Sequence, residues 1–221
     1  MRRNNLAGAA VAVVLCITMV LTGCTTAWVG QAEEIAAALI PAAANILALV
    51  AALQGNSISA TDLQTIQAAG TQAGADLQLI QSLITAYQTA DATAKPGILG
   101  QIQSGINAVE GSLQGLLPAM HVKDAATQAK ISAVVGLVLA EVQSLAAIVP
   151  LVNPGASPKM MAMAAAQAKM QPPLSAGQFI ASYNATLTAK TGNAELDKAT
   201  GKLQIHGHGK LARVVTAGVL K

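Results

Sequence analysis

The sequence predicts an all-α fold whose centre is an antiparallel, up-down four-helix bundle, and three observations lead to this prediction. The chain of 221 residues is 53% apolar, 10% charged and 2% aromatic. Its apolar residues recur at alternating spacings of three and four along four successive segments, a pattern typical of packed helices. The breaks between these segments are short, and short connections between long helices make neighbouring helices antiparallel.

The first 23 residues have the composition of an export signal and lie outside the predicted bundle. Arg2 and Arg3 form a positive start, and residues 6–21 form an apolar, uncharged run. This run is shorter than the about 20 residues of an ordinary membrane-spanning helix and matches the apolar core of a signal peptide. It leads into the tetrapeptide Leu21-Thr22-Gly23-Cys24, which resembles the lipobox of bacterial lipoproteins.

The resemblance to bacterial lipoproteins implies a covalent lipid anchor on Cys24. Proteins of this class carry a thioether-linked diacylglycerol on the cysteine, are cut in front of it, and receive an N-acyl chain on the new terminus. One acyl chain anchors a protein only marginally, whereas three chains hold it at the membrane. Thr25 stands where an Asp often retains lipoproteins at the inner membrane, so in a cell with two membranes the periplasmic side of the outer membrane is favoured. A plain thiol behind an uncleaved anchor and a twin-arginine signal are the alternatives.

Cleavage before Cys24 changes what the composition says about the mature chain. It removes Cys16, so no disulfide can form within the chain, and it reduces the 13 basic residues to 11 against 10 acidic residues. So small a net charge, with only four aromatic residues, argues against a nucleic-acid-binding surface. The low charge and high apolar content also argue against a disordered polyelectrolyte.

A short tether at residues 24–30 is expected to lead into the bundle, which spans residues 31–152. The first helical segment covers residues 35–53 and contains Pro41. Because proline removes one backbone hydrogen bond from a helix interior, we expect a kink at this point.

The other three segments follow short breaks that contain Gly, Pro or Asp. They cover residues 63–87, 99–120 and 131–152, after breaks at residues 55–57, 91–97 and 118–124. Ser57 or Ser59 is the expected N-terminal cap of the second segment. The four segments supply 28 seam positions, enough apolar surface for an independent core. These positions are Ile35, Leu39, Ala42, Ile46, Leu49, Leu53, Leu63, Ile66, Gly70, Ala73, Leu77, Ile80, Ile84, Tyr87, Leu99, Ile102, Ile106, Val109, Leu113, Leu116, Met120, Ile131, Val135, Val138, Val142, Leu145, Val149 and Val152.

Two pairs of glycines predict close approach of neighbouring helices. Gly70 and Gly74 lie in the second segment, and Gly111 and Gly115 lie in the third, each pair four residues apart. A glycine inside a helix costs about 1 kcal/mol relative to alanine, so tight packing is the expected compensation. The same spacing occurs in membrane helix dimers, which is the alternative use.

The outward positions of the bundle are expected to be polar but uncharged. The chain contains 17 glutamines, many of them in the second and third segments, accompanied by Ser and Thr. Such a surface produces little repulsion between copies of the chain or against a partner. It therefore indicates a protein partner or self-association through the bundle surface.

Two segments, residues 35–53 and 131–152, are apolar enough to suggest a membrane-inserting protein as an alternative. Much of their length is alanine, which drives insertion weakly, and Glu141 would cost about 2.5 to 3.5 kcal/mol at the centre of a bilayer. Core helices of a bundle are the favoured interpretation. A helical hairpin that inserts and perturbs a membrane stays open as the other interpretation.

A linker at residues 153–158 (Asn-Pro-Gly-Ala-Ser-Pro) separates the bundle from a basic tail rich in Ala, Met and Gly at residues 159–221. Within the tail we expect a short helix at residues 159–170, a second helix from the Ser175 cap to about residue 190, and a partly irregular end from residue 192 onward.

The linker also marks a change in the sign of the charge. Residues 31–154 carry eight acidic and three basic residues, whereas residues 155–221 carry two acidic and eight basic residues. The tail is therefore expected to pack on the acidic bundle. Contact with anionic groups of the cell envelope is the alternative.

The sequence contains no recognisable catalytic constellation, and we expect neither an enzyme nor a small-molecule substrate. A Gly-x-Ser-x-Gly turn and a paired-histidine zinc helix are both absent from the sequence. The expected role is that of a lipid-anchored structural or adaptor protein of the cell envelope, with the acyl groups on Cys24 as its only non-protein part. A copper-binding protein is a further alternative, since thioether and imidazole groups suit copper(I). The candidate ligands are Met160, Met161, Met163, Met170, His206 and His208.

Overall fold

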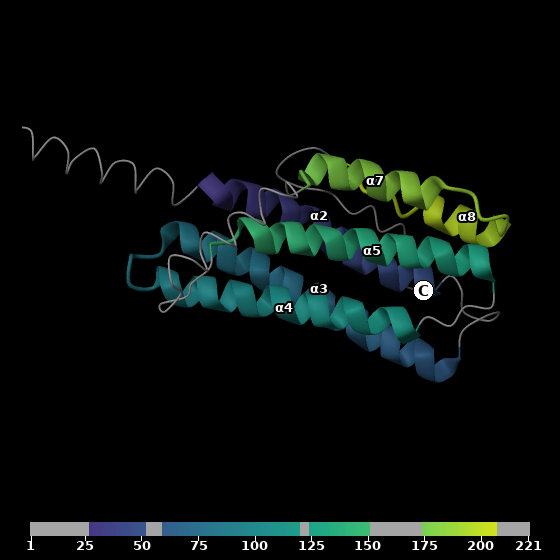
Figure 1. Cartoon of the computed structure of the whole chain (residues 1–221), viewed down its shortest axis with the longest axis horizontal. Coiled ribbons are helices and arrows are strands. Elements are labelled where there is room, and N and C mark those ends of the chain that lie inside the picture. The colour runs from purple at the N-terminus through teal and green to yellow at the C-terminus, as the bar shows by residue number, and fades with distance from the viewer. Residues whose placement is uncertain (1–26, 52–58, 120–123, 151–173, 207–221) are drawn as a thin grey trace, which may run out of the picture.

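The computed structural model describes residues 27–51, 59–119, 124–150 and 174–206, and this part of the chain is all-helical, as the sequence predicts (Figure 1). Six helices pack against one another. They are α2 (Ala27–Ala51), α3 (Ala60–Thr89), α4 (Lys95–Ala119), α5 (Ala125–Ile148), α7 (Ala176–Thr188) and α8 (Ala194–Gly201).

Helices α2 to α5 form the predicted up-down four-helix bundle. Each helix packs against the next one in the chain, and α5 packs back against α2, so the bundle closes. Successive helices run in opposite directions (Figure 1). The two remaining helices form an added layer: α7 lies along α2 and α5, and α8 packs against α7 and α2.

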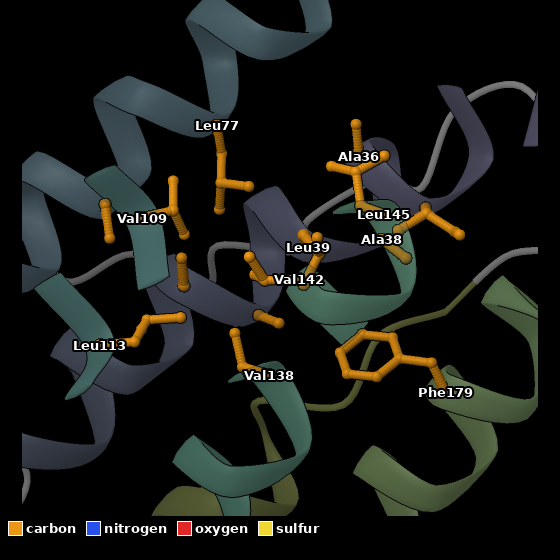
Figure 2. Packing of buried hydrophobic residues seen from close by; sticks show 14 of the residues in the cluster. Ala36, Ala38, Leu39, Leu77, Val109, Leu113, Val138, Val142, Leu145 and Phe179 are labelled. Atoms are coloured by element: carbon orange, nitrogen blue, oxygen red, sulfur yellow. The ribbon is translucent and has the colours of Figure 1, made fainter. Parts of the chain in front are cut away.

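The predicted seams form the core of the bundle. Every seam position that the structure describes is buried, apart from Leu63, which is half-buried against the core. Figure 2 shows side chains of α2, α3, α4 and α5 converging in the centre, among them Leu39, Leu77, Val109 and Val142. Leu53, Met120 and Val152 lie outside the described residues.

Polar side chains begin the helices where the sequence places its breaks. Ser59, not Ser57, caps α3, and its Oγ accepts a hydrogen bond from the Asp62 N–H at 3.1 Å. Asp124 caps α5 by accepting from the Thr127 N–H at 2.7 Å. Such caps contribute about 1 kcal/mol each, because the first N–H groups of a helix have no partner within it.

The turn before α4 is held by Asp91. Its carboxylate accepts hydrogen bonds from the Ala94 N–H at 2.8 Å and from the N–H and hydroxyl of Thr93. These bonds, the Ala94 bond first, lower the pKa of Asp91 because they favour the ionised form. The helix begins at Lys95, so Pro96 lies in its first turn, where proline is tolerated.

The first helix begins earlier than the sequence predicts. Helix α2 starts at Ala27, inside the tether expected at residues 24–30, and it continues through Pro41. Trp28 and Val29 are buried, and the Trp28 ring packs on Tyr87 of α3 with the ring centroids 5.1 Å apart. This contact between distant parts of the chain extends the helix into a segment that has no seam residue of its own.

One described helix near the end of the chain was not predicted from the sequence. Helix α8 (Ala194–Gly201) lies within the stretch expected to be partly irregular, and Asn193 caps it by accepting from the Leu196 N–H at 3.1 Å. Leu196 and Thr200 of this helix are buried. The short helix expected at residues 159–170 and the linker at residues 153–158 lie outside the described residues.

The glycine prediction is correct at one position and wrong at three. A Cβ on Gly70 would lie 2.5 Å from Cδ2 of Leu47, so α2 and α3 approach closely there. A Cβ on Gly74, Gly111 or Gly115 would meet nothing within 4 Å. The close contact of α4 is instead at Gly105, where a Cβ would lie 2.9 Å from Ile80 Cγ1 of α3.

Candidate functional site

The bundle has two sides that differ in what covers them. On one side, α7, α8 and the residues around them lie across α2 and α5; we call residues 174–206 the clasp (Figure 1). On the other side, the exposed residues of α3 and α4 meet no further helix of the described part of the chain; we call them the open face. Within the described residues, the clasp junction and the open face are the two candidate sites.

An apolar stripe attaches the clasp to the bundle. Phe179, Tyr183 and Leu187 are spaced by four along α7 and are all buried. Figure 2 shows the Phe179 ring pointing from α7 toward α2 and α5, near Ala38 and Val138. The Tyr183 hydroxyl also donates a hydrogen bond to the backbone oxygen of Ala42 at 3.4 Å.

A buried lysine fastens the clasp at one end of the junction. The Lys130 Nζ of α5 donates to the Ala189 carbonyl at 2.7 Å and to the Thr200 hydroxyl at 2.9 Å, and it lies 3.4 Å from the Asp197 carboxylate. The Thr191 N–H, more than Lys130, lowers the pKa of Asp197. This ion pair joins a basic residue of the bundle to an acidic residue of the clasp, which is the reverse of the charge pattern that the sequence led us to expect.

Glu141 of α5 is the unusual residue of the junction. Its side chain is 0% exposed, and within the described part of the chain neither carboxyl oxygen has a hydrogen-bond partner. Burial raises the pKa of Glu141 to about 7, because desolvation disfavours the charged form. The group can therefore gain or lose a proton near neutral pH.

The open face is polar but carries no exposed charge. Among the residues of α3 and α4 whose exposure the structure describes, none of the exposed ones is charged, and the four charged residues are half-buried. Those four are Asp62, Asp76, Lys95 and Glu110. The exposed residues of α4 are Pro96, Gly97, Gly100, Gln101, Ser104, Asn107, Ala108, Gly111, Gln114 and Gly115.

Most of the site residues predicted from sequence lie outside the described residues. These are Cys24, Met160, Met161, Met163, Met170 and His208. His206 is described and exposed. The described residues contain no group of three or more His, Cys, Asp or Glu side chains that could hold a metal ion, and copper binding stays a prediction.

Two described helices are long and apolar enough to cross a membrane, by length and composition alone. They are Trp28–Ala51 of α2 and Ala125–Ile148 of α5. These are the two helices that the clasp covers, and about half of each apolar window is buried within the fold. The arrangement agrees with core helices, the interpretation favoured from the sequence.

The predicted helix after the Ser175 cap and the predicted packing of the tail on the bundle are confirmed by α7. The α5 residues that meet the clasp were not identified from the sequence, although a signal for them exists. Lys130, Val134, Leu137, Glu141 and Ser144 recur at spacings of three and four beside the seam of α5. This second stripe indicates a second packed face, and Lys130 and Ser144 within it hydrogen-bond to the clasp. Comparisons with protein-family models, with curated proteins and with solved structures found no match to this chain.

Proposed function

We propose that this chain is a lipid-anchored protein of the cell envelope with a structural or adaptor role, and that it binds a protein partner through the open face. The observation that carries the proposal is the absence of exposed charge among the described residues of α3 and α4. About 25% of the residues of an ordinary soluble domain are charged. The centres of protein interfaces, by contrast, are depleted of charge, because an ion must lose its water to enter them.

The glycines of α4 give the proposal a second support. Gly97, Gly100, Gly111 and Gly115 are exposed, and a Cβ at any of them would meet nothing within 4 Å. Each interior glycine costs about 1 kcal/mol of helix stability relative to alanine. No contact within the described fold compensates for this cost, whereas a partner that approaches the bare backbone of α4 would do so.

The lipobox supports the proposal of a lipid anchor, and the position of α2 shows where such an anchor would hold the bundle. Two residues separate Cys24 from Ala27, where α2 begins. Three extended peptide units reach only about 10 Å, so an acylated Cys24 would hold the end of α2 close to the lipid surface. The anchor would then present the bundle directly at the membrane, on the periplasmic side of the outer membrane in a cell with two membranes.

Lipidation is tested by two matched serine variants in cells fed with labelled palmitate. Cys24→Ser is expected to lose the label, whereas Cys16→Ser, which changes the cysteine inside the signal, is expected to keep it. Equal labelling of the two variants would contradict the anchor at Cys24.

Partner binding is tested by photo-crosslinking from a photoreactive residue at Gln101, with the same residue at the exposed Ala133 of α5 as the control. We expect a discrete adduct from position 101 alone, and we expect Ser104→Lys, but not Ala133→Lys, to abolish it, because a lysine ammonium would have to be desolvated at the interface. Equal adducts from the two positions, or no adduct from either, would contradict the open face as a partner surface.

Membrane insertion is the second candidate function, and the two apolar helices α2 and α5 are the observation that favours it. Release of a trapped dye from liposomes by the purified, unlipidated chain is the expected result. A dye signal equal to that of buffer alone would contradict membrane insertion as a function of this chain.

A further inference from the structure

The clasp is a single unit that is tied together internally. The Asn184 side chain of α7 makes two hydrogen bonds with the backbone of Ile205, at 2.9 Å to its oxygen and 2.8 Å from its N–H. The Asp197 carboxylate of α8 accepts from the N–H of Thr191 at 3.0 Å. These bonds connect α7, the turn, α8 and the residues after it, so the clasp can dock or lift as one piece.

Polar contacts fasten the clasp to the bundle near the two ends of α7. At one end, Lys130 binds Ala189 and Thr200, and the Asn45 side chain of α2 donates to the Leu203 carbonyl at 2.6 Å. At the other end, the Leu174 N–H donates to the Ser144 hydroxyl at 3.3 Å. The α5 face that contains Lys130 and Ser144 is therefore the face that α7 covers.

Glu141 lies on this same face, three residues before Ser144 and eleven after Lys130. Residues three or four apart share a face of a helix, so Glu141 lies on the side of α5 that faces the clasp. Its zero exposure agrees with this position. A charge formed at this point would be sealed into an apolar interface, which is strongly unfavourable unless the charge is paired.

No charged group of the described fold is placed to pair with Glu141. Helix α7 carries no charged residue, and its titratable group, Tyr183, is buried. On α2, Glu33 accepts a hydrogen bond from Gln88 of α3, and Glu34 is exposed. Because these two carboxylates carry the same negative charge as an ionised Glu141, they would not stabilise its ionised form.

Apart from Lys130, no described lysine is buried. In the clasp, Lys190, Lys198 and Lys202 are exposed to solvent. On α4, Lys95 lies over the Tyr87 ring, 5.1 Å from its centroid, and Glu110 is half-buried. On α5 itself, Lys130 is about 16 Å away along the helix axis at 1.5 Å per residue, and it is occupied by the clasp.

We propose that protonation of Glu141 controls the docking of the clasp, and that ionisation of this carboxyl lifts residues 174–206 from α2 and α5. Lifting hydrates the carboxylate and uncovers the apolar sides of the two helices that Phe179, Tyr183 and Leu187 otherwise cover. The device is a pH-sensitive latch in which acid keeps the clasp closed and alkali opens it.

The direction and size of the effect follow from proton linkage. In the docked state the pKa of Glu141 is about 7, and a hydrated carboxyl of this type has a pKa of 4.5. The stabilising contribution of the neutral group is complete below pH 4.5 and is lost as the pH rises through 7. Between pH 5 and pH 9 the opening equilibrium should shift roughly 75-fold toward the lifted state.

Native-state hydrogen exchange of the full chain tests the latch, with rates corrected for the intrinsic pH dependence of amide exchange. From pH 5 to pH 9 the protection of α7 should fall roughly 75-fold while that of α3 changes little. Glu141→Gln should abolish this pH dependence, and Glu110→Gln, which changes a half-buried carboxyl on α4, should keep it.

A second variant keeps the test decisive if the buried amide of Glu141→Gln weakens the fold. Glu141→Leu places an apolar side chain of similar size in the junction, and α7 should then stay protected at pH 9. The latch is overturned if α3 and α7 lose protection together, if wild-type α7 is insensitive to pH, or if the Leu variant still opens at pH 9.

Discussion

The two sides of this bundle differ in how their outward surfaces are made compatible with water. Helices α2 and α5 are apolar on more than one face, and α7 and α8 cover them with buried aromatic and aliphatic side chains. Helices α3 and α4 bury mainly their seams, and Gln, Ser, Thr, Gly and Ala occupy most of their exposed positions, with Leu79 as a large apolar exception. The difference teaches that a chain with only 10% charged residues can stay folded either by adding a layer or by exposing uncharged polar groups.

The largest expected effect comes from removing an aromatic side chain on the covered side. Phe179→Ala deletes a ring that is 0% exposed between α7 and the bundle, and it should lower the free energy of unfolding by about 3 to 5 kcal/mol in a urea titration. Leu79→Ala on the open face, where the leucine is 51% exposed, should cost less than about 1 kcal/mol. Similar losses of unfolding free energy at the two positions would contradict the difference between the clasp side and the open face.

Breaking the polar fastening of the clasp should have the next largest effect. Lys130→Met keeps the length of the side chain but leaves the Ala189 carbonyl and the Thr200 hydroxyl without their donor, so we expect a loss of about 1.5 to 3 kcal/mol. Lys198→Met, at an exposed position of α8, is the control and should stay within about 0.5 kcal/mol. Thermal unfolding followed by circular dichroism measures both, and equal shifts would show that the Lys130 contacts add no stability.

The buried Glu141 at the clasp junction should also make the free energy of unfolding depend on pH. Because burial raises the pKa of Glu141 to about 7, the free energy of unfolding should fall by roughly 2 to 3 kcal/mol between pH 5 and pH 9, at about 1.4 kcal/mol per pKa unit. Urea titrations at the two pH values measure this change. Glu141→Leu should remove most of the decrease, and a decrease of the same size in that variant would assign it to other groups.

The smallest effect is expected on the open face and has the opposite sign. Gly111→Ala should stabilise the isolated chain by up to about 1 kcal/mol, since a Cβ there meets open space. Gly105→Ala should instead destabilise it, because its Cβ would lie 2.9 Å from Ile80 Cγ1. Differential scanning calorimetry separates the two, and a destabilised Gly111→Ala would reveal an intramolecular contact at the open face.

The bundle could be predicted from the sequence because the pattern of buried residues in each helix is local and periodic. Burial repeats every three or four residues along each helix, so a seam such as that from Ile66 to Tyr87 is visible without knowledge of its partners. Caps such as Ser59 and Ser175 are likewise set by residues a few positions apart.

The parts that the sequence did not predict depend on contacts between distant residues. The early start of α2 requires Tyr87 opposite Trp28, and the position of α8 requires Lys130 opposite Thr200. Glu141 reads in the sequence as a charge that opposes membrane insertion, and only the position of α7 identifies it as a buried group of the junction. Glycine spacing alone could not distinguish Gly105, where an added Cβ would meet Ile80, from Gly111, where an added Cβ would meet open space.

The most direct test of the central proposal is thiol labelling of the mature protein with one cysteine at Ser104 on the open face or at Ala38 under the clasp. An acylated Cys24 leaves no other thiol once the signal is removed, so the wild type should not react. Position 38, where the alanine is 2% exposed, should stay unlabelled in both purified protein and cell envelopes. Position 104 should react rapidly in purified protein and slowly in envelopes, where a partner covers the open face. Equal rates at position 104 in the two preparations would contradict the proposal.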